Sequence, residues 1–182
     1  NILKTPRGAE YQVTLPDGSK VWLNAASSIK YPLAFTAGER KIELTGEAYF
    51  EVSKDPNKKF VAFIKNNNCE TRGVVEVLGT HFNVQAYDED NLIAASLVEG
   101  SIKMSASQAG ASTVLSPGQQ AQLTPDNTLK VLNDVDMDGV TAWKNGRIDF
   151  KSVSLKTIMN AVSRWYNVDV LYEGNIEKKS GF

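Results

Sequence analysis

The chain has 182 residues, a formal net charge of −1 and 42% hydrophobic residues, which is the composition of an ordinary soluble globular protein. Because 20 basic residues face 21 acidic ones, there is no positive excess to bind a nucleic-acid backbone. The apolar runs are only a few residues long, so none predicts a membrane span. The single Cys69 excludes an internal disulfide. We expect a fragment whose targeting or membrane segments lie upstream of Asn1.

Short runs of alternating apolar and polar residues predict strands over most of the first 130 residues. The clearest pair, at 13–15 and 20–23, is separated by the turn Pro16-Asp17-Gly18-Ser19 and predicts a β-hairpin. Asp17 would stabilise this turn by local hydrogen bonds, and Gly18 by accepting a positive φ. Further strands are predicted at 40–44, 48–52, 60–64, 75–78, 81–84, 94–98, 101–104, 114–115 and 120–123.

A glycine separates successive apolar runs at Gly46, Gly79, Gly100 and Gly118. At Gly46, Gly79 and Gly100 we predict hairpin turns in which the glycine supplies a positive φ. The repeated strand–glycine–strand pattern indicates a mainly β fold. It fits a sandwich, a roll or an irregular β-solenoid, and periodicity does not choose among them. Aromatic residues are predicted to fill the core between the layers: Trp22, Tyr49, Phe50, Phe60 and Phe82.

The hydrophobic period changes near the C-terminus. Apolar residues at helical spacing predict an amphipathic helix that begins after Ser154 or Ser152 and runs to Trp165. The face comprises Leu155, Ile158, Met159, Val162 and Trp165. Alternation at 146–150 and 168–172 predicts a strand on either side of the helix. We therefore predict an all-β domain at 1–137 and a β-α-β subdomain at 138–182, which could be incomplete at its end. Trp143 and Trp165 would anchor the core or the subdomain interface.

An acidic stretch before this subdomain resembles the start of a calcium loop. Asp134, Asp136 and Asp138 alternate and are followed by Gly139, but position twelve of the loop would be Asn145, a weak ligand. We therefore favour a solvated linker and predict no metal site.

Catalytic constellations are sparse. A zinc site needs three or four ligands, whereas the chain has one histidine, His81, and one cysteine, Cys69. A Cys–His pair or a serine triad would have to use the same histidine. Glu47 and Glu51 lie on one face of a predicted strand and could form a glycosidase pair, but such a face is more often the wet side of a sheet. We predict no enzyme activity and no cofactor.

Several longer stretches, in order along the chain, are specific to a family. They are TPRGAEYQVTLPDGSKVWLNAASSIKYP, RKIELTGEAYFEVSKDPNKKF, VLGTHFNVQAY, LVEGSI and LSPGQQAQL. This series resembles the periplasmic part of FecR-type anti-sigma regulators. The tail AWKNGRIDFKSVSLKTIMNAVSRWYNVDVLYEG is similar to the C-terminal extension of the Bacteroidetes branch, which resembles the β-α-β unit of secretins and TonB-dependent transducers.

The resemblance implies a single-pass inner-membrane regulator of transcription. Its cytoplasmic segment, absent here, would hold an extracytoplasmic-function sigma factor. Its periplasmic part would sense the signalling domain of an outer-membrane TonB-dependent transporter. The alternatives are a structural or adhesive β module, or a carbohydrate-binding domain without catalysis.

The expected partner surface lies on the tail. If 147–150 and 168–172 are strands of a narrow sheet, their edges could accept an added strand from the partner. The side chains nearest these edges are Arg147, Asp149, Lys151, Asp169 and Tyr172. The simpler interpretation is that the tail only caps the β domain through Trp143 and Trp165.

Overall fold

Strands dominate the fold in the computed structural model, which describes residues 1–36, 38–106, 110–150 and 154–173. The mainly β prediction is therefore confirmed. The strands are Ile2–Lys4 (β1), Tyr11–Thr14 (β2), Lys20–Leu23 (β3), Ser28–Lys30 (β4), Arg40–Glu51 (β5), Phe60–Lys65 (β6), Thr71–Val77 (β7), His81–Ala86 (β8), Ile93–Glu99 (β9), Ile102–Ala106 (β10), Ser112–Leu115 (β11), Gln120–Leu123 (β12) and Leu129–Leu132 (β13).

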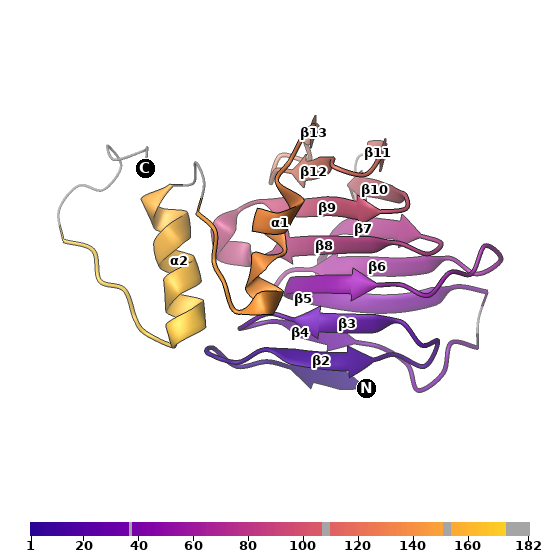
Figure 1. The fold of residues 1–182 in the computed structure, drawn as a ribbon, viewed down its shortest axis with the longest axis horizontal. Helices are drawn as coiled ribbons and strands as arrows, with labels where there is room; N and C mark the ends of the chain where they lie inside the picture. Colours follow the sequence, from indigo (N-terminus) through magenta and orange to yellow (C-terminus); the bar gives the residue numbers. More distant parts are fainter. Residues whose placement is uncertain (37, 107–109, 151–153, 174–182) are drawn as a thin grey trace.

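Helical turns are short except for one helix near the C-terminus. The helical elements are Asp88–Asp90 (η1), Met137–Val140 (α1), Ala142–Asn145 (η2) and Leu155–Tyr166 (α2). In Figure 1, α1 lies across β8 and β9, and α2 stands beyond the ends of the strands. Within the described residues no helix combines the length and apolar character that a membrane crossing requires.

The long strand β5 belongs to two half-sheets. The first half-sheet has the order β1-β4-β5-β6-β7-β10-β11, and the second has the order β2-β3-β5-β8-β9-β12-β13. Residues 40–44 of β5 pair with β6, and residues 46–51 pair with β8. Only the β5–β6 pair is parallel among the pairings described. The hydrophobic core lies between the half-sheets and draws on both.

Glycine corners join the two half-sheets. Gly79 connects β7 to β8, Gly100 connects β9 to β10, and Gly118 connects β11 to β12; in each case the two strands lie in different half-sheets. Gly46 lies inside β5, where the strand passes from one half-sheet to the other. The hairpins predicted at Gly46, Gly79 and Gly100 are therefore wrong, although Gly46 and Gly100 have the expected positive φ. A glycine between two apolar runs is equally compatible with a hairpin and with a crossing between half-sheets.

The glycines serve these corners in two ways. Gly46 has φ of 84°, and a Cβ there would lie 2.5 Å from Ser27 Oγ. Gly79 lacks the expected positive φ, but a Cβ there would lie 2.6 Å from Lys54 Cα. The first position needs a backbone conformation that other residues avoid, whereas the second needs only space.

The predicted Pro16-Asp17-Gly18 hairpin is confirmed between β2 and β3. Asp17 accepts a hydrogen bond from the Ser19 backbone at 3.1 Å, and Gly18 has φ of 83°. Asp17 also binds the guanidinium of Arg40 at 2.7 Å, and Arg40 is almost fully buried. The turn is thus fixed to β5 by a buried ion pair that the sequence pattern did not indicate.

Three of the five predicted core aromatics lie in the core. Phe50 and Phe82 stack with ring centroids 4.8 Å apart, and Phe60 packs edge-on against Phe50 at 6.1 Å. Trp22 and Tyr49 instead lie outside the core cluster, with Lys144 of η2 3.9 Å from the centre of the Tyr49 ring. Strand alternation places both rings on the outer face of the second half-sheet. The core prediction is therefore wrong for Trp22, which is only half-buried, whereas Tyr49 is buried as predicted, at 4% exposure, but against Lys144 and not between the half-sheets.

The C-terminal helix agrees with its sequence pattern. α2 begins directly after Ser154, whose side chain accepts a hydrogen bond from the Thr157 backbone. The flanking strands do not: 146–150 and 168–172 form no strand in the described part of the chain. Among the described residues, neither segment forms main-chain hydrogen bonds with a neighbouring strand. The two strand predictions are therefore wrong. The domain division at residue 137 stays a prediction.

Candidate functional site

A buried carboxylate lies where the C-terminal segment meets the β domain. Glu47, in β5, accepts hydrogen bonds from Asn24 at 2.8 Å and from Asn83 at 3.0 Å. Each asparagine in turn accepts a bond from an indole of the C-terminal segment. Trp165 donates to Asn24 at 3.0 Å, and Trp143 donates to Asn83 at 3.1 Å. The two indoles thereby fix the orientation of the two amides toward Glu47.

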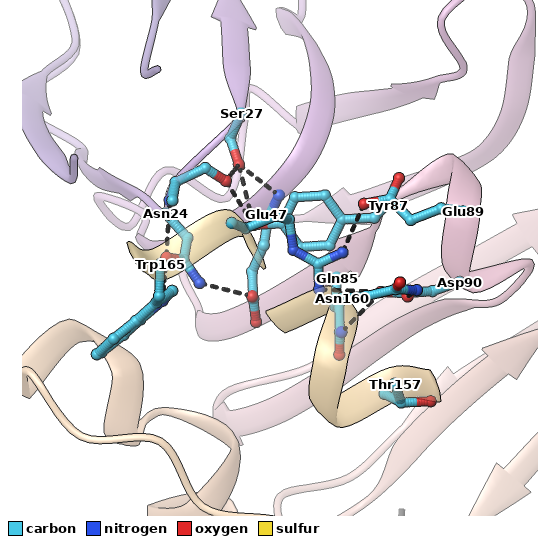
Figure 2. A network of polar contacts seen from close by, with 12 residues as sticks. Asn24, Ser27, Glu47, Gln85, Tyr87, Glu89, Asp90, Thr157, Asn160 and Trp165 are labelled. Carbon is cyan, nitrogen blue, oxygen red and sulfur yellow. Dashed lines mark hydrogen bonds and ion pairs between the residues drawn. The ribbon is translucent and has the colours of Figure 1, made fainter. Parts of the chain in front are cut away.

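An ion-pair cluster continues this contact along α2, as Figure 2 shows. The guanidinium of Arg164 binds Glu89 at 2.6 Å and Asp90 at 3.2 Å, and it lies 3.6 Å from the centre of the Tyr87 ring. Asn160, one turn earlier, donates to Asp90 at 2.9 Å. The Arg164 side chain is only 6% exposed, which is unusual for arginine unless it is paired as here.

We call these groups together the Glu47 junction. The β domain contributes Asn24, Glu47, Asn83, Tyr87, Glu89 and Asp90, and the C-terminal segment contributes Trp143, Asn160, Arg164 and Trp165. Every buried side-chain nitrogen or oxygen in the described residues has a hydrogen-bond partner. The junction is therefore a complete polar interface, in which removal of one partner leaves another unsatisfied.

Burial alters the acid–base properties of the junction. It raises the pKa of Glu47 to about 7, although the bonds from Asn83 and Asn24 and the charge of Arg164 favour the ionised form. Burial, with the nearby charge of Glu47, also raises the pKa of Tyr87 above its ordinary value. Glu47 consequently changes its charge near neutral pH, which few carboxylates do.

The residues considered above as possible metal ligands or catalytic groups are dispersed. Asp136 accepts the Gly139 backbone N–H as the cap of α1, and no group of three or more potential metal ligands occurs within the described residues. His81 binds Glu99 at 3.2 Å, and Cys69 is exposed in a turn. Glu51 pairs in register with His81, whereas Glu47 is covered by the C-terminal segment.

The four predicted partner-binding residues that the structure describes do not share a sheet edge. Arg147 and Asp149 are exposed and border a cavity beside the junction. Asp169 is 91% exposed and binds Arg7 at 3.0 Å, and Tyr172 is exposed. Their segments run on different sides of α2 in Figure 1. Lys151 lies outside the described residues.

Sequence reasoning missed most of the junction. From the sequence alone, Arg164 is only a favourable charge near the C-terminal end of the helix, and Asn24, Asn83 and Asp90 carry no signal. One clue was available: Asn160 and Arg164 are polar residues at helical spacing on a face of α2 away from the apolar one. In most amphipathic helices such a polar stripe faces solvent, so the pattern alone does not indicate docking.

Two protein-family models match the chain. "FecR protein" matches residues 1–103, and "FecR, C-terminal" matches residues 147–181. Two crystal structures, at 1.65 Å and 2.50 Å, of a candidate anti-sigma factor from Parabacteroides distasonis ATCC 8503 are also similar. Each is 33% identical, has a TM-score of 0.83, and aligns over 92% of this chain and 75% of its own. No curated protein matches the chain.

Proposed function

The chain belongs to the FecR family of signalling regulators, and we propose that it is the periplasmic sensing part of a single-pass inner-membrane anti-sigma factor. It would relay a signal from an outer-membrane TonB-dependent transporter to an extracytoplasmic-function sigma factor. The sigma factor would bind a cytoplasmic segment that precedes this region. The relay would need no catalysis and no cofactor.

The observation that carries the proposal is the match of both family models in order, one on the β domain and one on the tail. The similar crystal structures support it, because the likeness extends over nearly the whole chain. A regulator of this kind acts through protein–protein contacts, so the surface of the tail is the part to test.

The Glu47 junction supports a sensing role for the tail. Indole and guanidinium groups hold the tail to the β domain, and interfaces between parts that move apart are more polar than permanent ones. If a partner bound the tail and displaced it, the hydrogen bonds of the Glu47 junction would be replaced by hydrogen bonds to the partner or to water. This costs less than opening an apolar core.

We place the partner contact on the exposed side chains of the tail, Arg147, Asp149, Asp169 and Tyr172. Lys151 completes the expected set but lies outside the described residues. Because 147–150 and 168–172 form no strand, the contact is proposed through side chains and no longer through an added strand.

The test measures binding of the purified signalling domain of the cognate transporter to this chain. Arg147→Glu should weaken binding by about ten-fold, since reversing a charge at an interface opposes the partner's potential. Lys4→Glu, an equal charge change on β1 at an exposed position, should leave binding unchanged. Neither change should alter the melting temperature, which circular dichroism would follow.

Binding that survives deletion of residues 140–182 would contradict the contact on the tail and place it on the β domain. If the signalling domain binds neither the chain nor the full regulator, the proposed relay itself is wrong. A sigma-dependent reporter in cells, with the same variants in the full regulator, separates these two outcomes.

A further inference from the structure

Polar side chains form two rows across the outer face of the second half-sheet, where a soluble sheet covered by another element would ordinarily be apolar. Cross-strand partners at successive strands define each row. One row is Tyr49, Asn83, Ser96 and Gln120. The other row is Glu47, Gln85, Ala94 and Gln122.

One inner strand of this face, β9, forms the floor of a hollow. β9 presents the small side chains Ala94 and Ser96, whereas its neighbours present Gln85 on β8 and Gln122 on β12. Long side chains on either side of short ones leave a depression. The C-terminal segment closes over it through Trp143, and the resulting cavity has a volume of about 640 Å³, within the usual range for small-molecule sites.

The hydrogen bonds of the hollow leave capacity for a ligand. Gln122 donates to Gln120 at 2.8 Å, and Gln120 donates to the Ser96 hydroxyl oxygen at 2.7 Å. The carboxamide oxygen of Gln122 and the hydroxyl proton of Ser96 have no hydrogen-bond partner among the described residues. The hollow therefore offers a ligand one hydrogen-bond acceptor, on Gln122, and one donor, on Ser96, and both side chains are uncharged.

The charges around the hollow narrow the ligand class. Arg164 and Asp90 are already paired with each other, and Glu47 accepts from two amides. The C-terminal side of the cavity adds charges of both signs from Asp136, Arg147 and Asp149, so the lining has no excess of positive charge for an anion. An anion would lie against these carboxylates, and a cation would leave the amide rows unused. Neutral hydroxyl groups, each a donor and an acceptor, match amide and serine side chains best.

We propose that this cavity binds a small uncharged saccharide, with Gln122 and Ser96 as the groups that contact its hydroxyls. The site goes beyond the relay, because it gives the chain a ligand of its own. Since the floor belongs to the β domain and Trp143 to the C-terminal segment, a ligand that contacts both would stabilise their docked arrangement.

Titration of the chain with glucose, galactose, N-acetylglucosamine, maltose and cellobiose tests the site. Trp143 borders the cavity, so tryptophan fluorescence should change saturably with at least one of them below about 20 mM. Gln122→Leu should weaken that binding by about ten-fold, because the hydroxyl contact loses its acceptor. Gln12→Leu, the same change at an exposed position on β2, should have no effect.

Isothermal titration calorimetry on the same proteins provides a second readout that does not depend on tryptophan. Absence of saturable binding by every saccharide in the series overturns the proposal. It is also overturned if binding persists unchanged in Gln122→Leu while circular dichroism shows that the variant is folded. Neither result bears on the relay, which is tested with the transporter domain.

Discussion

The β domain and the C-terminal segment are stabilised by opposite kinds of interaction. The core cluster consists of buried apolar side chains from both half-sheets. Among the described residues, its last member along the chain is Leu123, and Leu129 packs against the cluster. The C-terminal segment instead docks through indole–amide bonds, an arginine ion pair and a stacked tyrosine. The apolar residues of α2 remain only half-buried, whereas Arg164 is buried.

This difference implies that the folding of the β domain and the docking of the tail depend on different interactions. Apolar burial stabilises the β domain in proportion to the area removed from water, and it requires nothing from the tail. The junction depends on matched donors and acceptors, which bring little net free energy but are specific in geometry. We therefore expect that the tail can leave the β domain without unfolding it, and that changes at the two places have separable effects.

The largest expected effect is in the core. Phe50→Ala removes a ring that stacks on Phe82 and contacts Phe60, and it leaves a cavity between the half-sheets. The free energy of unfolding should fall by about 3–5 kcal/mol, measured by urea denaturation followed by circular dichroism. Leu33→Ala, at a position 82% exposed, is the control and should change it little. A small loss in Phe50→Ala would mean that the core repacks freely.

A smaller effect, dependent on pH, is expected at the junction. Burial raises the pKa of Glu47 from 4.5 to about 7, so the folded protein holds a proton that the unfolded chain releases. Its contribution to stability is fully present below pH 4.5 and is lost as pH rises through 7, a change of roughly 3 kcal/mol.

Glu47→Gln should flatten this pH dependence, because the glutamine does not titrate. Urea denaturation at a series of pH values from 4 to 8 would compare the variant with the natural chain. The matched control is Glu43→Gln, also on β5, where the carboxylate pairs with Lys30 at the surface. This variant should keep the dependence of stability on pH. An unchanged slope in Glu47→Gln would assign the titration to another group.

The smallest effect on the β domain is expected from removing the tail. A chain of residues 1–137 keeps the whole apolar core and exposes mainly polar side chains, so it should stay folded and rich in strands. Far-ultraviolet circular dichroism and a cooperative thermal transition would show this. An unfolded product would mean that the tail completes the core, against the division proposed at residue 137.

The local features of the fold could be predicted because their causes are local. Alternation located most strands, the Pro16-Asp17-Gly18 turn gave its hairpin, and the spacing of Leu155, Ile158, Met159 and Val162 gave α2 almost to the residue. Each depends on neighbours within a few positions. The FecR resemblance depended on ordered stretches of sequence, and the family matches confirm it.

The strand order and the Glu47 junction depend on contacts between residues far apart in the sequence, which no local pattern encodes. Gly79 and Gly100 look like hairpin glycines, but the strand after each one pairs in the other half-sheet. Arg164 can be buried because its guanidinium forms an ion pair with Asp90, which lies 74 residues earlier in the chain. Glu47 looked like a wet residue on an alternating strand, and only the folded-back tail covers it.

One consequence follows from the single strand that serves both half-sheets. β5 is hydrogen-bonded to β4 and β6 through its first part and to β3 and β8 through its second. Opening either half-sheet at β5 would remove main-chain partners from a strand that the other half-sheet shares, so we expect the β domain to behave as one cooperative unit, with the amides of β5 among the slowest to exchange. If the proposed relay moves part of this protein, we expect that motion at the Glu47 junction, with the β domain as a rigid reference.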